Sequence, residues 1–173
     1  MECSIEMSSE TIQQRFAALL DEHRKIVFKV ANTYCRDTDD RADLAQEIAA
    51  QLWRAFPAYD PRRSFSTWMY RIALNVAISS LRSQRQRVER SVALDESLHD
   101  IADDNLVDPV AEQQLRMLHG FIAELAPLDR ALLLLYLEDR RQAEIADILG
   151  ISESNVATKI SRLKQRIRNH IPN

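Results

Sequence analysis

Glycine is almost absent from this chain, whose 173 residues include two glycines and five prolines. Alanine, leucine, isoleucine, arginine, glutamine and glutamate dominate instead, and these residues propagate helices while offering little turn chemistry for hairpins. A chain of this length can form one mid-sized domain or two small ones. The composition predicts an all-α protein, and two small helical domains fit best.

A change in charge along the chain predicts where these domains are joined. From Arg62 to Arg90 there are seven arginines against the single acid Glu89, whereas from Ser91 to Glu112 there are seven acids and no lysine or arginine. The second stretch also loses helical periodicity and contains Asp108-Pro109, where the residue before proline is pushed away from helical geometry. We therefore expect domains at residues 1–92 and 113–173, joined by an acidic linker at 93–112.

Several classes of protein and site are disfavoured by what the sequence lacks. No window approaches the roughly 18 apolar residues of a membrane span, and no basic stretch followed by an apolar core marks the N-terminus, so we expect a cytoplasmic protein without membrane insertion. Cys3 and Cys35 lack the spacing of a zinc site, so no metal, cofactor or disulfide is expected. No carboxylate pair, Cys/His pair or phosphate loop has catalytic spacing, which disfavours an enzyme.

Apolar residues at helical spacing predict the individual elements. Three helices are expected before Pro57, and a fourth from about Ser66 to Arg85. After the acidic stretch, one amphipathic helix ends before Pro127, and a strongly apolar helix follows from Leu128 to about Leu137. Short helices complete the second domain.

The segment from Gln142 to Val156 has the pattern of a helix, a turn and a second helix. Gly150 supplies the break, because glycine takes the left-handed conformation at little cost, and Ser152 can cap the next helix. A helix that is cationic on one flank fits the major groove of DNA, although a solvated basic face on a structural helix is the alternative. The candidate DNA-binding residues are Ser152, Glu153, Ser154, Asn155, Lys159, Arg162 and Arg166.

A second candidate site lies on the long helix expected at residues 66–85. Spacings of three and four residues align Trp68, Arg71, Asn75, Ser79 and Arg82 in one polar, basic and aromatic stripe. An aromatic ring beside cations suits single-stranded DNA, because the ring stacks on a base while the cations hold the backbone. The preceding loop, Tyr59 to Phe65, could form a pocket for an extruded base. Equally, Trp68 could be a core residue and the loop an ordinary connector.

These residues resemble the extracytoplasmic-function (ECF) sigma factors, small members of the sigma-70 family of RNA polymerase sigma factors. Asp43-Leu-Ala-Gln-Glu-Ile48 with Trp53 looks like the family's polymerase-docking helix, and Ser64 to Asn75 looks like its promoter-melting and −10 recognition helix. The resemblance covers nearly the whole chain. It implies a factor that binds RNA polymerase core and promoter DNA, recognises −10 and −35 elements, and aids melting.

The resemblance also implies residue roles and partners. The polymerase contacts would be made to the clamp helices of the largest subunit and to the flap, and an anti-sigma factor would be a further partner. The expected clamp contacts are Asp43, Gln46, Glu47 and Trp53. The expected −10 and melting residues are Tyr59, Arg62, Arg63, Phe65, Trp68, Arg71, Asn75, Ser79 and Arg82. The helix-turn-helix would read the −35 element.

The chain departs from the family pattern at three places. Asp139-Arg-Arg-Gln-Ala143 stands where the family often has glycine followed by serine or threonine. Val156-Ala157 replaces a usual Val-Lys pair, for which Lys159 could supply the displaced charge, and Asp40-Arg-Ala-Asp43 is less acidic than usual.

Two rival interpretations stay open from the sequence. One is a helix-turn-helix regulator that is not a polymerase subunit, which leaves the Trp68 stripe unexplained. The other is a helical protein-interaction module with decayed DNA contacts.

Overall fold

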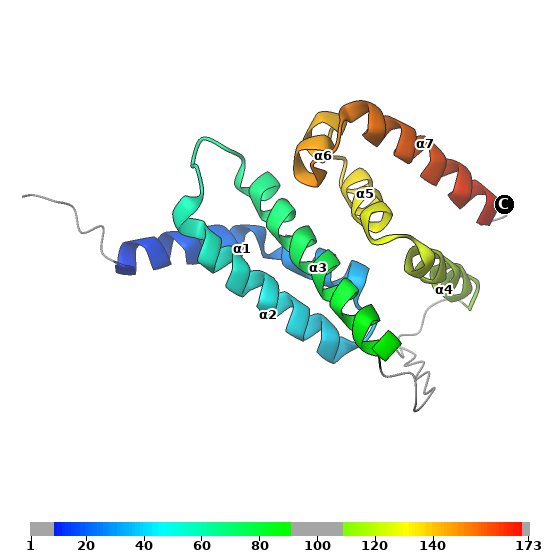
Figure 1. Cartoon of the computed structure of the whole chain (residues 1–173), viewed down its shortest axis with the longest axis horizontal. Helices are drawn as coiled ribbons and strands as arrows, with labels where there is room; N and C mark the ends of the chain where they lie inside the picture. Colours follow the sequence, from blue (N-terminus) through cyan, green and yellow to red (C-terminus); the bar gives the residue numbers. More distant parts are fainter. Residues whose placement is uncertain (1–8, 91–108, 171–173) are drawn as a thin grey trace, which may run out of the picture.

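The structure is a computed structural model, and it describes residues 9–90 and 109–170. These ranges contain no β-strand, so the prediction of an all-α chain is confirmed. The elements, drawn in Figure 1, are α1 (Ser9–Tyr34), α2 (Thr38–Ala55), the 3-10 helix η1 (Phe56–Ala58), α3 (Phe65–Arg90), α4 (Pro109–Glu124), α5 (Pro127–Leu137), α6 (Gln142–Leu149) and α7 (Glu153–His170).

The first domain is a bundle of α1, α2 and α3, which all pack against one another. Its centre is formed by Val30, Ile48, Leu52, Met69 and Tyr70, which are fully buried. The Asp37 side chain caps the start of α2, because it accepts hydrogen bonds from the backbone N–H groups of Asp39 and Asp40. This bundle holds the expected melting helix rigidly along most of its length.

The expectation of three helices before Pro57 is wrong, because residues 12–20 and 26–34 form a single helix, α1. The segment between them, Asp21-Glu-His-Arg-Lys25, contains neither glycine nor proline, and its charged residues are exposed. Nothing in such a segment ends a helix, since its polar residues propagate one as well as the apolar residues do.

The second domain contains α4 to α7. Arg130 on α5 is buried, and its guanidinium donates to the backbone carbonyls of Ala123 and Leu125, where α4 ends. A cation at this point satisfies carbonyls that the helix leaves unpaired and opposes the negative end of its dipole. Because α4 begins at Pro109, the last four residues of the expected linker, 109–112, are helical. Residues 93–108 of that linker lie outside the described residues.

Two turns in this domain use left-handed residues. Gly150, at φ 67°, ends α6 as predicted, and the N–H of Ile151 returns to the carbonyl of Ala146. Asp139, at φ 55°, ends the turn after α5 in the same left-handed conformation. Its N–H donates to the carbonyl of Tyr136, and the N–H of Arg140 donates to the carbonyl of Leu135. An aspartate thus occupies a position where glycine is unstrained.

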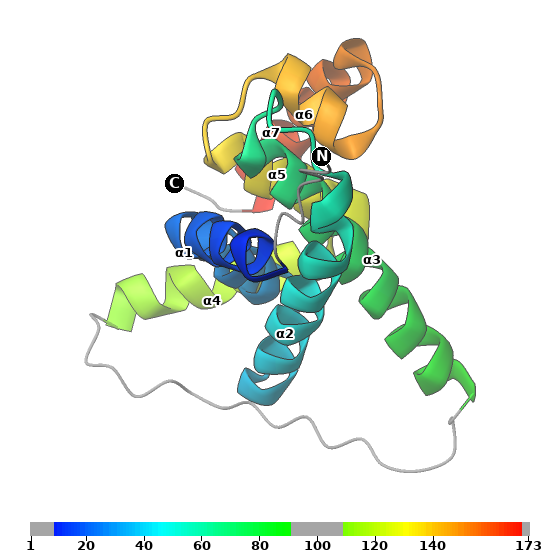
Figure 2. The ribbon, with the colours of Figure 1, turned by 90° about the vertical axis from the view of Figure 1, so that its left-hand side faces the viewer.

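The two domains pack against each other. Figure 1 and Figure 2 show α5 and α6 beside α3, and α5 also packs on α1. We call this arrangement the closed form. In the described part of the chain, no helix is both long and apolar enough to cross a membrane.

Candidate nucleic-acid interface

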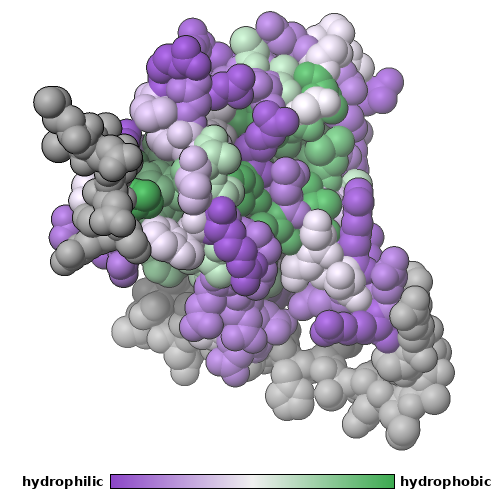
Figure 3. Space-filling model, turned by 60° about the vertical axis from the view of Figure 1, so that its left-hand side comes forward, coloured by the Kyte–Doolittle hydropathy of each residue, from purple (hydrophilic) through white to green (hydrophobic). Residues whose placement is uncertain are grey.

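The predicted stripe on α3 is open to solvent along most of its length. Arg71, Asn75, Ser79 and Arg82 are exposed, whereas Met69, Ala73, Leu74 and Ala77 on the other side of the helix are buried. The bundle therefore fixes α3 through its apolar side and presents the polar, basic side outward. Figure 3 shows hydrophobic side chains gathered between hydrophilic ones on one face of the molecule.

Trp68, at the start of the stripe, is half-buried in an aromatic cluster. Its ring centre lies 5.0 Å from that of Tyr59, 5.3 Å from that of Phe65 and 6.3 Å from that of Phe56. The Tyr59 hydroxyl donates a 2.7 Å hydrogen bond to the carbonyl of Arg63, which fastens the loop before α3. Trp68 thus packs one side against the aromatic cluster and leaves the other accessible, and its contact with DNA stays a prediction.

The other residues of the loop have different environments. Phe65 is buried at 6% exposure, so the chain offers its ring to the core rather than to a ligand. Arg62 donates hydrogen bonds to the carboxylate of Asp60, and these bonds lower the pKa of that carboxyl. Arg63 is exposed. The loop therefore presents two cations and the Tyr59 ring, with Phe65 as the support beneath them.

The helix-turn-helix is formed by α6 and α7. Val156, Ile160 and Leu163 are buried, as the sequence predicted, and Ile167 is partly buried. The Ser152 hydroxyl accepts a 3.2 Å hydrogen bond from the backbone N–H of Asn155, so it serves as the cap of α7. The side chains left exposed near the start of the helix include Glu153, Ser154, Asn155 and, about two turns later, Arg162.

Two of the predicted cations on α7 have partners within the domain. The Nζ of Lys159 lies 3.2 Å from the carboxylate of Asp129 on α5, and both side chains are largely buried. The Cζ of Arg166 lies 5.6 Å from the ring centre of Phe121 on α4. Lys159 thus helps to hold α7 on α5 through its ion pair with Asp129.

The four expected polymerase-binding residues share one exposed face of α2. Asp43, Gln46, Glu47 and Trp53 are all exposed, and the opposite face, with Leu44, Ile48 and Leu52, is buried. Trp53 is 42% exposed, and its ring centre lies 5.2 Å from that of Phe16 on α1. The face combines acidic and amide groups with one large aromatic ring held in place by a neighbouring helix.

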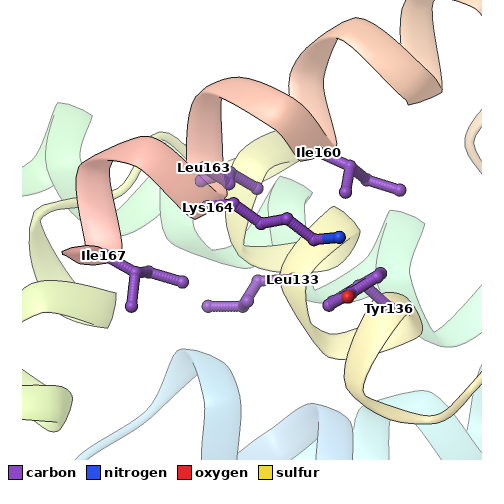
Figure 4. Close-up of a pocket in the computed structure, with 6 residues that line it drawn as sticks. All are labelled: Leu133, Tyr136, Ile160, Leu163, Lys164 and Ile167. Carbon is purple, nitrogen blue, oxygen red and sulfur yellow. The ribbon is translucent and has the colours of Figure 1, made fainter.

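Figure 4 shows a shallow groove between α5 and α7 that the sequence patterns did not single out. Tyr136 is 38% exposed, and the Nζ of Lys164 lies 4.9 Å from its ring centre. The cation covers the aromatic ring, and the aliphatic wall is largely buried, since Leu133, Ile160 and Leu163 are each at most 6% exposed. The groove is lined by Leu133, Tyr136, Ile160, Leu163, Lys164 and Ile167.

The sequence patterns also missed a polar cluster that joins α6 to α3. Arg140 donates hydrogen bonds of 3.1 Å to the Ser66 hydroxyl and of 2.6 Å to the Glu144 carboxylate, and Thr67 donates one of 2.8 Å to the same carboxylate oxygen. Partial burial raises the pKa of Glu144, but the hydrogen bonds from Thr67 and Arg140 outweigh it and leave that pKa below its ordinary value.

A second set of contacts joins α5 to the first domain. The Nζ of Lys29 lies 2.5 Å from the carboxylate of Glu138, and the buried Tyr70 hydroxyl donates to the same oxygen at 3.5 Å. The Tyr34 hydroxyl donates a 2.6 Å hydrogen bond to the carbonyl of Pro127. Burial, and next the charge of Glu138, raise the pKa of Tyr70 to about 12. These contacts would all be broken if the domains separated.

Comparison with known proteins places both domains. The family models for Sigma-70 region 2 and Sigma-70 region 4 match residues 19–87 and 115–167. SigW of Bacillus subtilis, an ECF RNA polymerase sigma factor, is 25% identical over 92% of this chain and 90% of its own length. SigK of Mycolicibacterium vanbaalenii, named in the same way, is 28% identical over 90% of this chain and 79% of its own length.

A third relative is longer. The probable RNA polymerase sigma factor RfaY of Xanthomonas campestris is 29% identical over 92% of this chain, which spans 41% of that protein. Two solved structures share the fold. They are RpoE of Bartonella quintana with the anti-sigma factor NepR (TM-score 0.65, 17% identity, 93% of this chain and 96% of that one) and CnrH with the cytosolic domain of CnrY (0.63, 21%, 88% and 84%).

The two matched regions together cover more than half of the chain and coincide with its two helical domains. They occur in the same order as the exposed α3 stripe and the helix-turn-helix. The chain belongs to the extracytoplasmic-function subfamily of the sigma-70 RNA polymerase sigma factors.

Proposed function

We propose that this sigma factor uses three separate surfaces to direct promoter-specific initiation. The exposed face of α2 binds the clamp helices of polymerase core, the stripe on α3 engages and helps to melt the −10 element, and the start of α7 reads the −35 element. The chain contributes binding and orientation, and it carries out no catalytic step of its own. Because it acts on polymerase and promoter DNA, we place the protein in the cytoplasm.

The observation that carries the proposal is the division of α3 into two faces. Its apolar face is locked in the bundle, so the exposed Arg71, Asn75 and Arg82 are presented on a rigid helix. Rigid cations neutralise phosphates without a large entropic cost of ordering, and an amide such as that of Asn75 can hydrogen-bond an unpaired base. A purely structural helix would not need this concentration of basic and amide groups on its solvent side.

The aromatic cluster would receive a base at the edge of the melted region. Tyr59 and the accessible side of Trp68 supply stacking surfaces, and Arg62 and Arg63 lie in the same loop. Stacking on aromatic side chains is worth about 1–3 kcal/mol per base. Phe65 contributes by holding the two rings from below.

For the −35 element, we assign direct contacts to Glu153, Ser154, Asn155 and Arg162, which are exposed. Arg166 follows one turn later and would reach the DNA backbone. Ser152 and Lys159 act indirectly, because they cap and anchor α7. The division of labour we propose along the chain is 1–92 for core binding and −10 recognition, 93–112 as the connection, and 113–173 for −35 recognition.

Two further partners follow from the surfaces. The apolar groove between α5 and α7 would bind the polymerase flap. The solved relatives RpoE and CnrH are bound to NepR and to the cytosolic domain of CnrY, of which NepR is an anti-sigma factor, and we propose that this chain also has an anti-sigma partner.

The test compares two exposed positions on α3. Asn75→Ala removes a stripe amide, whereas Gln84→Ala removes an exposed amide from a different side of the same helix. With core enzyme and a promoter, we expect Asn75→Ala to reduce strand opening about tenfold or more while core binding stays unchanged, and Gln84→Ala to resemble the wild type. Equal loss of opening and core binding in Asn75→Ala would make the stripe structural.

A further inference from the structure

We propose that Arg140 latches the two domains of the free protein into the closed form, in which the protein cannot reach the −10 and −35 elements together. The inference rests on the proposed function, since it concerns the use of both DNA-reading surfaces. It gives a role to the stretch Asp139 to Ala143, where this chain departs from the family pattern.

Arg140 lies at the centre of the contact between the domains. Its Cζ lies 5.1 Å from the ring centre of Tyr70, and its Nη1 bonds Ser66 and Glu144. The side chains of Arg140 and Glu144 are 22% and 20% exposed. A guanidinium can be buried to this extent because its planar fork stacks on an aromatic ring while its edge donates several hydrogen bonds.

The turn after α5 positions Arg140. The backbone of Asp139 is in the left-handed conformation, so the chain reverses sharply between Glu138 and Arg140. As a result, the side chains before and after the turn both contact Tyr70: one accepts a hydrogen bond from its hydroxyl, and the other stacks on its ring. Lys29 pairs with Glu138 and completes the contact from α1. Four charged or aromatic groups from two helices, α1 and α3, and one turn thus converge across the domain boundary.

The closed form is too short to span the promoter. The −10 and −35 elements lie about 25 base pairs apart, which is about 85 Å of duplex. Thr67 and Glu144 are hydrogen-bonded. Asn75 lies about 12 Å further along α3, and the chain from Glu144 to Asn155 reaches about 38 Å even when fully extended. The two reading surfaces can therefore be no more than about 60 Å apart until the latch opens.

The latch does not work by covering the −10 surface. The α3 residues whose hydrogen bonds or ring contacts with the second domain are described above, Ser66, Thr67 and Tyr70, lie outside the stripe, and Asn75 and Arg82 remain exposed in the closed form. The closed form therefore restricts only the distance between the −10 and −35 reading surfaces. Binding of core polymerase would hold the domains apart, so the cost of opening would appear as weaker binding of the free protein to core.

The experiment measures the size of the free protein by small-angle X-ray scattering. Arg140→Glu places a third carboxylate beside Glu138 and Glu144, whereas Arg141→Glu makes the same charge change at an exposed neighbouring side chain. We expect a radius of gyration near the value of about 16 Å for a compact chain of this length in the wild type and in Arg141→Glu. Arg140→Glu should be several ångströms larger with unchanged helix content by circular dichroism.

A locked variant keeps the test decisive if Arg140→Glu folds poorly. Thr67→Cys with Glu144→Cys, made after replacing Cys3 and Cys35, should form a disulfide that holds the closed form. Oxidised protein should remain compact and lose binding to a duplex that carries both elements, while it still binds a single-stranded −10 oligonucleotide. Reduction should restore binding to the duplex.

The outcomes separate the latch from the proposed function. A wild type as extended as Arg140→Glu, or an oxidised variant that binds the full promoter normally, overturns the latch. If Arg140→Glu is extended and binds core several-fold more tightly than the wild type, both proposals are supported. If it is extended but neither protein binds core, the latch stands and the proposed function fails.

Discussion

The guanidinium of Arg140 lies over the ring of Tyr70, with 5.1 Å between its Cζ and the ring centre, across the boundary between the two domains. Tyr70 is fully buried and belongs to the core of the first domain, whereas Arg140 follows α5 in the second. The pair therefore connects the core that supports the α3 stripe to the turn that leads into the helix-turn-helix. Substitutions of Arg140 or Tyr70 should therefore change how the two domains are arranged.

The lowered pKa of Glu144 predicts acid sensitivity of the closed form. A carboxyl group whose pKa is lowered by folding stabilises the folded protein at pH values above its pKa in the unfolded chain, which is about 4.3. That contribution is lost as the pH falls through the lowered pKa of the folded protein. By NMR titration, the Glu144 carboxyl should titrate below 4.3 in the wild type and closer to 4.3 in Thr67→Val, which removes one hydrogen-bond donor. An ordinary Glu144 titration in the wild type would contradict the contact with Thr67.

Tyr70 predicts the opposite dependence at high pH. Burial, and then the charge of Glu138, raise its pKa to about 12, so its contribution is fully present below about pH 10 and is lost as the pH rises through 12. Ultraviolet titration should show late-ionising tyrosines, and the part of that signal due to Tyr70 should disappear in Tyr70→Phe, whereas Tyr34, whose pKa is also raised by burial, should still ionise late. Glu138→Gln should move that ionisation to lower pH, and no movement would mean that the carboxylate does not face the hydroxyl.

The sequence predicted the parts of this protein that depend on local pattern. The Gly150 turn, the Ser152 cap and the buried Val156 and Ile160 follow from helical spacing and capping chemistry, and all are present. The exposed side of α3 followed from the same periodicity. Family resemblance supplied the proposed polymerase-binding role of the exposed α2 face, which spacing alone would have left as a solvated surface.

Contacts between distant segments could not be predicted in this way. The ion pair of Lys159 with Asp129, which lies thirty residues earlier in the chain, is one such contact. The partners of Arg140 on α3 are seventy or more residues away, and no periodicity relates them. The usable signal was the departure from the family pattern at Asp139 and Arg140, although only the fold shows what those residues contact.

Asp139→Gly should stabilise the protein. The left-handed conformation at φ 55° costs a non-glycine residue about 1 kcal/mol, and Asp139 adds a negative charge just after the negative end of α5. After the entropic cost of glycine in the unfolded chain, we expect a gain of about 0.5–1 kcal/mol in the free energy of unfolding by urea denaturation. Asp147→Gly, within α6, should instead lose about as much, and equal losses in both variants would contradict the proposed strain.

Arg130 should be important for stability because it caps the end of α4 from a buried position. Arg130→Met keeps much of the volume but leaves the carbonyls of Ala123 and Leu125 without their donor. We expect a loss of about 2–3 kcal/mol in the free energy of unfolding. Arg130→Lys should lose less, since it keeps the charge, and a loss below about 0.5 kcal/mol in Arg130→Met would show that water replaces the cap.

The measurement that tests the central claim most directly is reconstitution of the full chain with RNA polymerase core on a promoter from its own regulon. The account predicts that the chain binds core with an affinity that falls when Asp43 and Glu47 are both replaced by alanine. It also predicts that initiation starts at a defined site only when the chain is present. Binding of promoter DNA without any association with core, or core binding without site-specific initiation, would contradict the account.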